Sequence, residues 1–194
     1  MDWINVSPKN MMEIPEFLTD VQNKIGQINS PVPMLEWDGI CYTQSQAIVL
    51  YVGRRCGFGG ETDYQRYQID MLLSAADDLR TNMNECLFIP AFGLHGTIDH
   101  VNNFQENSLP SHLNDLSTKL GDSNYFLGKD LTTPDAVIYD VFVNLTAMFP
   151  ECLKEKENLS QWKTRMDNIP QIAEYLLSEK HTSNLHFHPT MLGT

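Results

Sequence analysis

The spacing of hydrophobic residues changes part-way along the chain. In roughly the first third, short apolar runs of strand character alternate with helical spacing, and after Glu61 the spacing is helical. Gly57, Gly59 and Gly60 separate the two regions and are typical of a linker. The pattern predicts an α/β domain, an all-helical domain and a tail, with the bounds 1–58, 61–182 and 183–194.

The first region contains signals for a helix, a hairpin and a second helix. Apolar residues recur at helical spacing over 14–25. Two runs of strand character, 34–37 and 40–42, flank Asp38-Gly39, a dipeptide that favours a tight hairpin. A mostly apolar stretch over 45–56 then predicts a largely buried helix that ends at Gly57.

The second region predicts a helical bundle. Thr62 to Gln65 forms a capping box, and a long apolar stripe follows it. Thr132 and Asp135 predict another helix start, with the aspartate accepting from the threonine amide and a buried central helix after it. The remaining segments with helical spacing are 69–87, 109–120, 159–166 and 169–177.

Charge and cysteine spacing exclude several functions. The formal net charge is -12, which disfavours nucleic acid and anionic lipid as partners because both require a basic surface. The four cysteines form no C-x-x-C pair, so we expect separate thiols in a reducing compartment, with no disulfide framework and no metal site. No apolar stretch is long enough to span a bilayer, and no signal peptide is recognised at Met1. We therefore expect a cytoplasmic protein.

Three motifs occur in a restrictive order along the chain. They are Val32-Pro33-Met34-Leu35 with the following hairpin and Gln44-Ser45-Gln46, then Asp77-Asp78-Leu79-Arg80, and then the segment 128–135. In order and spacing they resemble the cytosolic glutathione S-transferases, above all the mu, pi and sigma types, over about 31–180. The resemblance implies a thioredoxin-like N-terminal domain, incomplete at its start, followed by an all-α domain.

The resemblance also implies a glutathione site. In the family, the backbone of the residue at Val32, turned by a cis bond before Pro33, pairs with the cysteinyl part of glutathione. Gln44 and Ser45, at a helix start, correspond to the site of the γ-glutamyl carboxylate. Asp78 corresponds to the acidic residue that reaches from the second subunit of a dimer to the γ-glutamyl amine. From the residues alone, Gln44 and Ser45 also fit a helix cap, and Asp78 fits a solvated helix face.

The first thirty residues depart from the family pattern. The family begins with a strand that carries a catalytic tyrosine or serine, followed by a helix with an arginine. Residues 1–30 contain no tyrosine and no arginine, and their hydroxyl groups are those of Ser7, Thr19 and Ser30. We therefore assign no catalytic residue, and whether the chain is an enzyme stays open.

Three hypotheses follow for the function. The first is a transferase that binds glutathione and attaches its thiolate to an electrophilic small molecule, most simply as a homodimer. The second is a catalytically inactive, transferase-like structural subunit of a larger assembly, in which a partner chain covers the open strand edge of the incomplete sheet. The third is an ordinary enzyme whose true start lies upstream of Met1.

Overall fold

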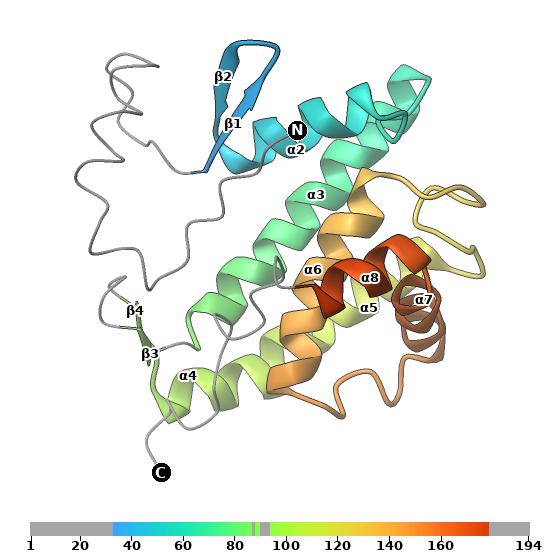
Figure 1. Cartoon of the computed structure of the whole chain (residues 1–194). Coiled ribbons are helices and arrows are strands. Elements are labelled where there is room, and N and C mark those ends of the chain that lie inside the picture. Colours follow the sequence, from blue (N-terminus) through green and yellow to red (C-terminus); the bar gives the residue numbers. More distant parts are fainter. Residues whose placement is uncertain (1–32, 87, 90–93, 179–194) are drawn as a thin grey trace. The chain divides into compact units, whose positions relative to one another are not determined.

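The computed structural model describes residues 33–86, 88–89 and 94–178 (Figure 1). The chain divides into two compact units, 1–59 and 60–194, and each is described by itself. In the described part, no helix combines the length and the apolar character needed to cross a membrane. The predicted helix over 14–25 and the predicted tail over 183–194 lie outside the described residues.

The first unit contains the predicted hairpin. Strand β1 (Met34–Trp37) pairs with strand β2 (Ile40–Thr43) in antiparallel register, from Met34 opposite Thr43 to Trp37 opposite Ile40. The connecting residues Asp38 and Gly39 have φ angles of 52° and 73°. Both values are positive, as a two-residue hairpin turn of type I′ requires. The prediction from the Asp-Gly dipeptide is therefore confirmed.

Helix α2 (Ser45–Arg55) follows the hairpin and packs on it. Tyr51 meets Trp37 edge to face at 5.8 Å between ring centroids. Among the described residues of this unit, the buried apolar side chains are those of Leu35 and Ile48. The prediction of a largely buried helix is wrong, since Ile48 and Gly53 are its buried residues in the described structure. The described sheet has two strands, so it covers only one side of the helix.

The second unit begins with the long helix α3 (Asp63–Asn84). Its start is the predicted capping box: the Gln65 amide donates to Thr62 Oγ1 at 3.1 Å, and the Thr62 amide donates to Gln65 Oε1 at 3.1 Å. The predicted apolar stripe faces the core. Its described members are all buried, namely Ile69, Leu72, Leu73, Ala76, Leu79 and Met83.

Helix α6 (Thr133–Met148) runs beside α3 through the core of this unit (Figure 1). Ile138, Phe142 and Leu145 on α6 are fully buried, which confirms the predicted central helix. Helix α7 (Glu157–Asp167) contributes the buried Trp162 to the same core, and the short helix α8 (Pro170–Leu177) packs on α7.

Between α3 and α6 the structure differs from the sequence prediction in two ways. A short hairpin of β3 (Phe88–Ile89) and β4 (Leu94–His95) interrupts the helices. Its two-residue strands are too short to show an alternating pattern, so no hydrophobic periodicity predicts them. Helix α4 (Ile98–Asn103) and a π-helical turn, η3 (Phe104–Ser108), then lead directly into α5 (Leu109–Leu120), and of these only α5 was predicted.

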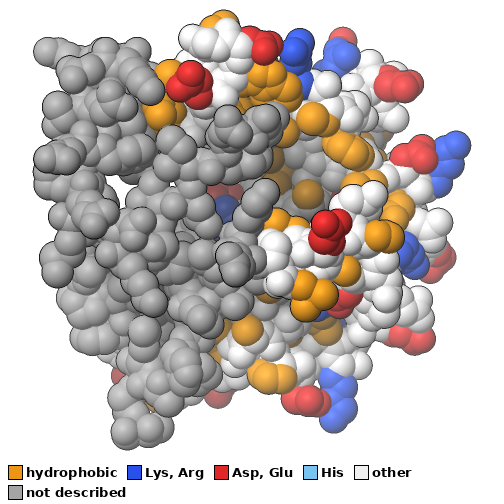
Figure 2. Space-filling view, in the orientation of Figure 1, with side chains coloured by type: hydrophobic (Ala, Val, Ile, Leu, Met, Phe, Trp, Pro, Cys, Tyr) orange, Lys and Arg blue, Asp and Glu red, His pale blue; other side chains and the backbone are white. Residues whose placement is uncertain are grey.

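Acidic and basic side chains of the described residues lie interspersed with apolar ones on the face shown in Figure 2. Exposed ion pairs of the described residues include Arg80 with Asp140 at 3.3 Å and Arg66 with Asp63 at 2.9 Å. Exposed pairs of this kind contribute at most about 1 kcal/mol each. The fold therefore depends mainly on the apolar core.

Candidate functional site

The open end of the β1–β2 hairpin brings two predicted site residues to one place. Met34 is paired with Thr43, so the next residues outward, Pro33 and Gln44, leave the hairpin at the same end. Both are exposed. Val32, which precedes Pro33, lies outside the described residues, so its predicted role stays a prediction.

The start of α2 is open. Gln44 has φ 73° and ψ 110°, an uncommon conformation for a residue other than glycine. Its side chain makes no capping hydrogen bond, while its carbonyl accepts the first helical bond from the Ile48 amide at 2.9 Å. Ser45 is the first helical residue and is exposed. Gln44 thus occupies the N-cap position, as the alternative prediction of a helix cap has it, but only its backbone carbonyl makes a capping bond.

This helix start has the properties of an anion site. The amides of the first helical turn point out of the helix, and the N-terminal end of the helix dipole is positive. The first turn contains no acidic side chain that would occupy these donors. A carboxylate placed here would accept hydrogen bonds from the backbone without displacing a protein group.

Two tyrosines of the first unit stack on each other. The rings of Tyr42 and Tyr51 lie 4.3 Å apart between centroids, and the Tyr42 hydroxyl donates to Tyr51 Oη at 3.0 Å. This donated bond, followed by burial, raises the pKa of Tyr42. The Tyr42 hydroxyl therefore stays protonated, and its proton is directed at Tyr51 Oη within the pair.

Asp78 lies on α3, in the second unit. It is exposed, as is its neighbour Asp77. Asp78 thus belongs to a different unit from Gln44 and Ser45. Its predicted role across a dimer stays a prediction. The expected electrophile pocket near Phe88 and Phe92 falls on side chains outside the described residues.

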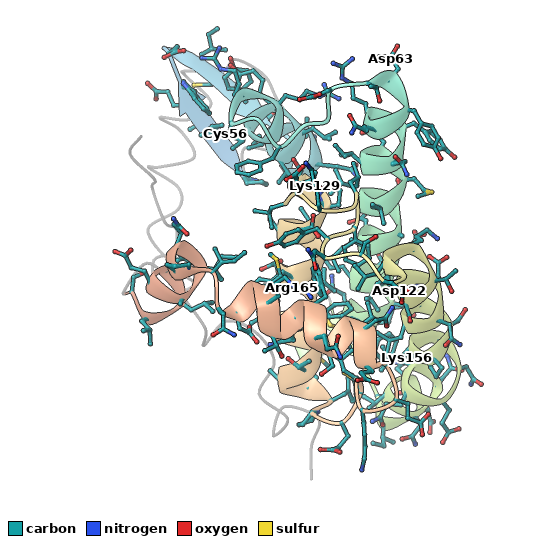
Figure 3. The ribbon with its side chains drawn as sticks, turned by 90° about the vertical axis from the view of Figure 1, so that its right-hand side faces the viewer. Cys56, Asp63, Asp122, Lys129, Lys156 and Arg165 are labelled. Atoms are coloured by element: carbon teal, nitrogen blue, oxygen red, sulfur yellow. The ribbon has the colours of Figure 1, made fainter. Side chains whose placement is uncertain are left out.

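The four cysteines are free thiols, three of them buried or half-buried as expected and one, Cys56, exposed. Cys56, labelled in Figure 3, is exposed at the end of α2, and Cys41 is half-buried in β2. Burial raises the pKa of Cys86 and of Cys152 to about 11. Within the described ranges, no group of three or more His, Cys, Asp or Glu side chains is arranged to hold a metal ion.

The start of α6 is closed, in contrast to that of α2. The fully buried Asp135 carboxylate accepts the Thr132 amide at 2.9 Å, the Phe126 amide at 3.0 Å and Trp162 Nε1 at 3.0 Å. Burial raises the pKa of Asp135, and these donated bonds oppose the rise. The bond to Thr132 was predicted. The bonds to Phe126 and Trp162 were not, because no local pattern links residues so far apart in the sequence.

Comparison with protein families identifies the second unit. Residues 96–179 match the family model described as "Glutathione S-transferase, C-terminal domain". This segment includes α5, α6, α7 and α8, so the match extends over most of the helical bundle.

Curated relatives match both units. A class-mu 26 kDa glutathione S-transferase, isozyme 51, of Fasciola hepatica is 31% identical over 138 residues, which are 71% of this chain and 61% of the relative. The human glutathione S-transferase Mu 3 is 28% identical over 92% of this chain and 70% of its own length. The chain thus spans about three-fifths of the length of the Fasciola hepatica relatives.

Solved structures share the fold. The structure described as rat hPGDS complexed with a quinoline has a TM-score of 0.74 at 21% identity, covering 94% of this chain and 85% of that chain. The Pi-class glutathione S-transferase of Onchocerca volvulus has a TM-score of 0.68 at 21% identity, covering 81% and 75%. The fold is therefore that predicted: an incomplete thioredoxin-like domain followed by a helical bundle. With the matches in sequence, it shows that the chain belongs to the glutathione S-transferase family.

Proposed function

We propose that this chain binds glutathione at the open end of the β1–β2 hairpin. The γ-glutamyl carboxylate lies at the start of α2, held by backbone amides and by the side chains of Gln44 and Ser45. The cysteinyl part runs along Val32 and Pro33 as an added strand. Asp78 of a second copy reaches the γ-glutamyl amine in a cytoplasmic homodimer.

The observation that carries this proposal is the open start of α2 beside Pro33. The register of the hairpin puts Pro33 and Gln44 at one end, and the first helical turn lacks both a side-chain cap and an acidic residue. An uncommon backbone conformation such as that of Gln44 often accompanies a functional site. The names of the relatives point to the same ligand.

The reaction we propose is the conjugation of glutathione to an electrophilic carbon. The thiol loses its proton to solvent, the thiolate sulfur forms a C–S bond with the carbon, and the leaving group departs with its bonding electrons. A bound thiol near neutral pH needs a hydrogen-bond donor to stabilise the thiolate. In the described residues we assign no such donor, and residues 1–30 lack tyrosine and arginine.

The test is a calorimetric titration of glutathione into the full chain. We expect binding in the micromolar to millimolar range, weakened at least about fivefold by Gln44→Ala or Ser45→Ala, because charge-assisted hydrogen bonds are lost. Gln46→Ala, an exposed neighbour on α2 without an assigned role, is the matched control. Cysteinylglycine, which lacks the γ-glutamyl carboxylate, should not bind.

The same preparation tests activity. Mixing it with glutathione and 1-chloro-2,4-dinitrobenzene releases chloride and forms a coloured thioether if the chain is an active transferase. Glutathione binding without turnover would favour the alternative of a structural, transferase-like subunit, whose specific support is the lack of a tyrosine in residues 1–30. A folded chain that binds no glutathione would overturn the proposed function.

A further inference from the structure

A cavity of about 610 Å³ lies in the second unit, where the end of α6 meets the start of α5. Leu109 and Leu113 on α5 and Phe149 after α6 form buried apolar walls. Gln105, Asn114 and the segment 151–156 form its polar rim. A volume of this size is in the range of about 300–1,000 Å³ that is typical of small-molecule sites.

Two breaks in helical hydrogen bonding leave backbone acceptors at this cavity. Helix α6 ends at Met148, which lines the cavity, and Pro150 has no N–H to donate to Thr146 O. In the described structure no main-chain amide beyond the helix donates to the carbonyls of residues 146–148. The C-terminal end of this 16-residue helix is also the negative end of its dipole.

The second break is the π-helical turn. The Leu109 amide donates to Phe104 O, five residues back, and Pro110 has no N–H. The carbonyl of Gln105 therefore lacks its usual helical donors. Gln105 and Pro110 both line the cavity, so the π-helical turn forms part of its wall.

The charged side chains on the rim differ in whether they have an ion-pair or hydrogen-bond partner. Lys154 pairs with Glu151 at 3.5 Å, and Lys156, labelled in Figure 3, donates to Asn114 Oδ1 on α5. Glu155 also lines the cavity and is exposed, and among the described residues it has no ion-pair partner. Lys154 is therefore paired with a carboxylate and Lys156 with an amide oxygen, while the Glu155 carboxylate and the carbonyl oxygens at the two breaks accept no bond from either lysine.

We propose that this cavity binds a small amphipathic amine. The apolar body lies against Leu109, Leu113 and Phe149, and the protonated amine lies at the rim, between the Glu155 carboxylate and the carbonyls at the end of α6. The chain's net charge of -12 adds a general attraction for cations. An anionic ligand of the same shape would meet these unpaired oxygens, and of the lining lysines Lys154 is paired with Glu151 and Lys156 is hydrogen-bonded to Asn114.

Three probes with one skeleton separate charge from hydrophobicity: phenylbutylamine, phenylbutanol and phenylbutyrate. Cys152 lines the cavity and supplies the readout, because a bound ligand covers its half-buried thiol. Alkylation with N-ethylmaleimide at about pH 8.5, where a slow thiolate reaction proceeds, is followed by peptide mass spectrometry. Cys56, exposed in the first unit, is the internal control. We expect the amine to protect Cys152 but not Cys56.

Glu155→Gln should weaken amine binding about three- to fivefold and leave phenylbutanol unchanged, since an exposed charge pair contributes modestly. Glu174→Gln on α8 is the matched exposed control outside the cavity. Phenylbutanol or phenylbutyrate protecting Cys152 as well as the amine, or equal amine affinity in Glu155→Gln, would overturn the proposal. The glutathione titration of the same variants reports on the proposed function separately, because Glu155 has no part in that site.

Discussion

Helix starts with and without a side-chain cap both occur among the described residues. At α3, α4 and α6 a threonine and the residue three positions later form a capping box, and at α6 the Asp135 carboxylate accepts further donors from Phe126 and Trp162. At α2 the N-cap residue Gln44 makes no side-chain capping bond, and Gln44 and Ser45 are exposed. The N-cap residues of α7 and α8 also make no side-chain capping bond. The two kinds use the same property of a helix, its unpaired N-terminal amides.

The difference decides how many backbone donors a helix start has left for a ligand. A start with a capping box gains stability and has fewer free amides. An open start gives up that stability, in the range of about 0.5–2 kcal/mol, and keeps its donors available. Substitutions at the two kinds of helix start should therefore differ in their effects on the free energy of unfolding and on glutathione binding.

The largest expected effect comes from opening the closed start of α6. Asp135→Ala should lower the free energy of unfolding by about 3–5 kcal/mol, because four donors, the Thr132 amide and hydroxyl, the Phe126 amide and Trp162 Nε1, lose a buried, hydrogen-bonded carboxylate. Urea unfolding followed by circular dichroism measures the change. Asp130→Ala, an exposed aspartate shortly before α6, should stay within about 0.5 kcal/mol of the original chain. A similar loss in both variants would contradict a special role for Asp135.

Much of this fold could be predicted from local patterns. The Asp38-Gly39 turn and the capping boxes at Thr62 and Thr132 depend on residues within four positions of one another, and all three are present. The contacts of Asp135 with Phe126 and Trp162 join residues 9 and 27 positions apart, so local spacing could not indicate them.

Like the contacts of Asp135, the π-helical turn and the cavity could not be predicted from local spacing. Pro110 and Pro150 are visible in the sequence, but neither predicts a cavity until packing places the end of α6 beside α5.

The candidate glutathione residues were predicted from the resemblance to the glutathione S-transferases. For Pro33 and Gln44 the hairpin register adds a common location, while the role of Asp78 depends on a second chain.

A smaller effect is expected at the single cap of α3. Thr62→Ala should lower the free energy of unfolding by about 1 kcal/mol, because the Gln65 amide loses its acceptor Thr62 Oγ1. Ser45→Ala at the start of α2 should cost less than about 0.5 kcal/mol, since no capping bond is lost there. Equal losses in these two variants, measured by urea unfolding, would show that α2 is capped as strongly as α3.

The smallest change in stability, and the most informative one for the comparison, comes from closing the open start. Ser45→Asp puts a carboxylate in the first turn of α2, which has no acidic residue there. Its attraction to the helix N-terminus should raise the free energy of unfolding by about 0.3–1 kcal/mol at low salt, since the negative charge lies at the positive end of the dipole. The same carboxylate should occupy the amides and repel the γ-glutamyl group, so glutathione binding should be lost.

Ser45→Asn, which is close in size but uncharged, separates the effect of charge from that of bulk. A Ser45→Asp chain that is more stable and still binds glutathione as before would show that the ligand uses a different part of the molecule, because an occupied helix start has no donors left for a second carboxylate.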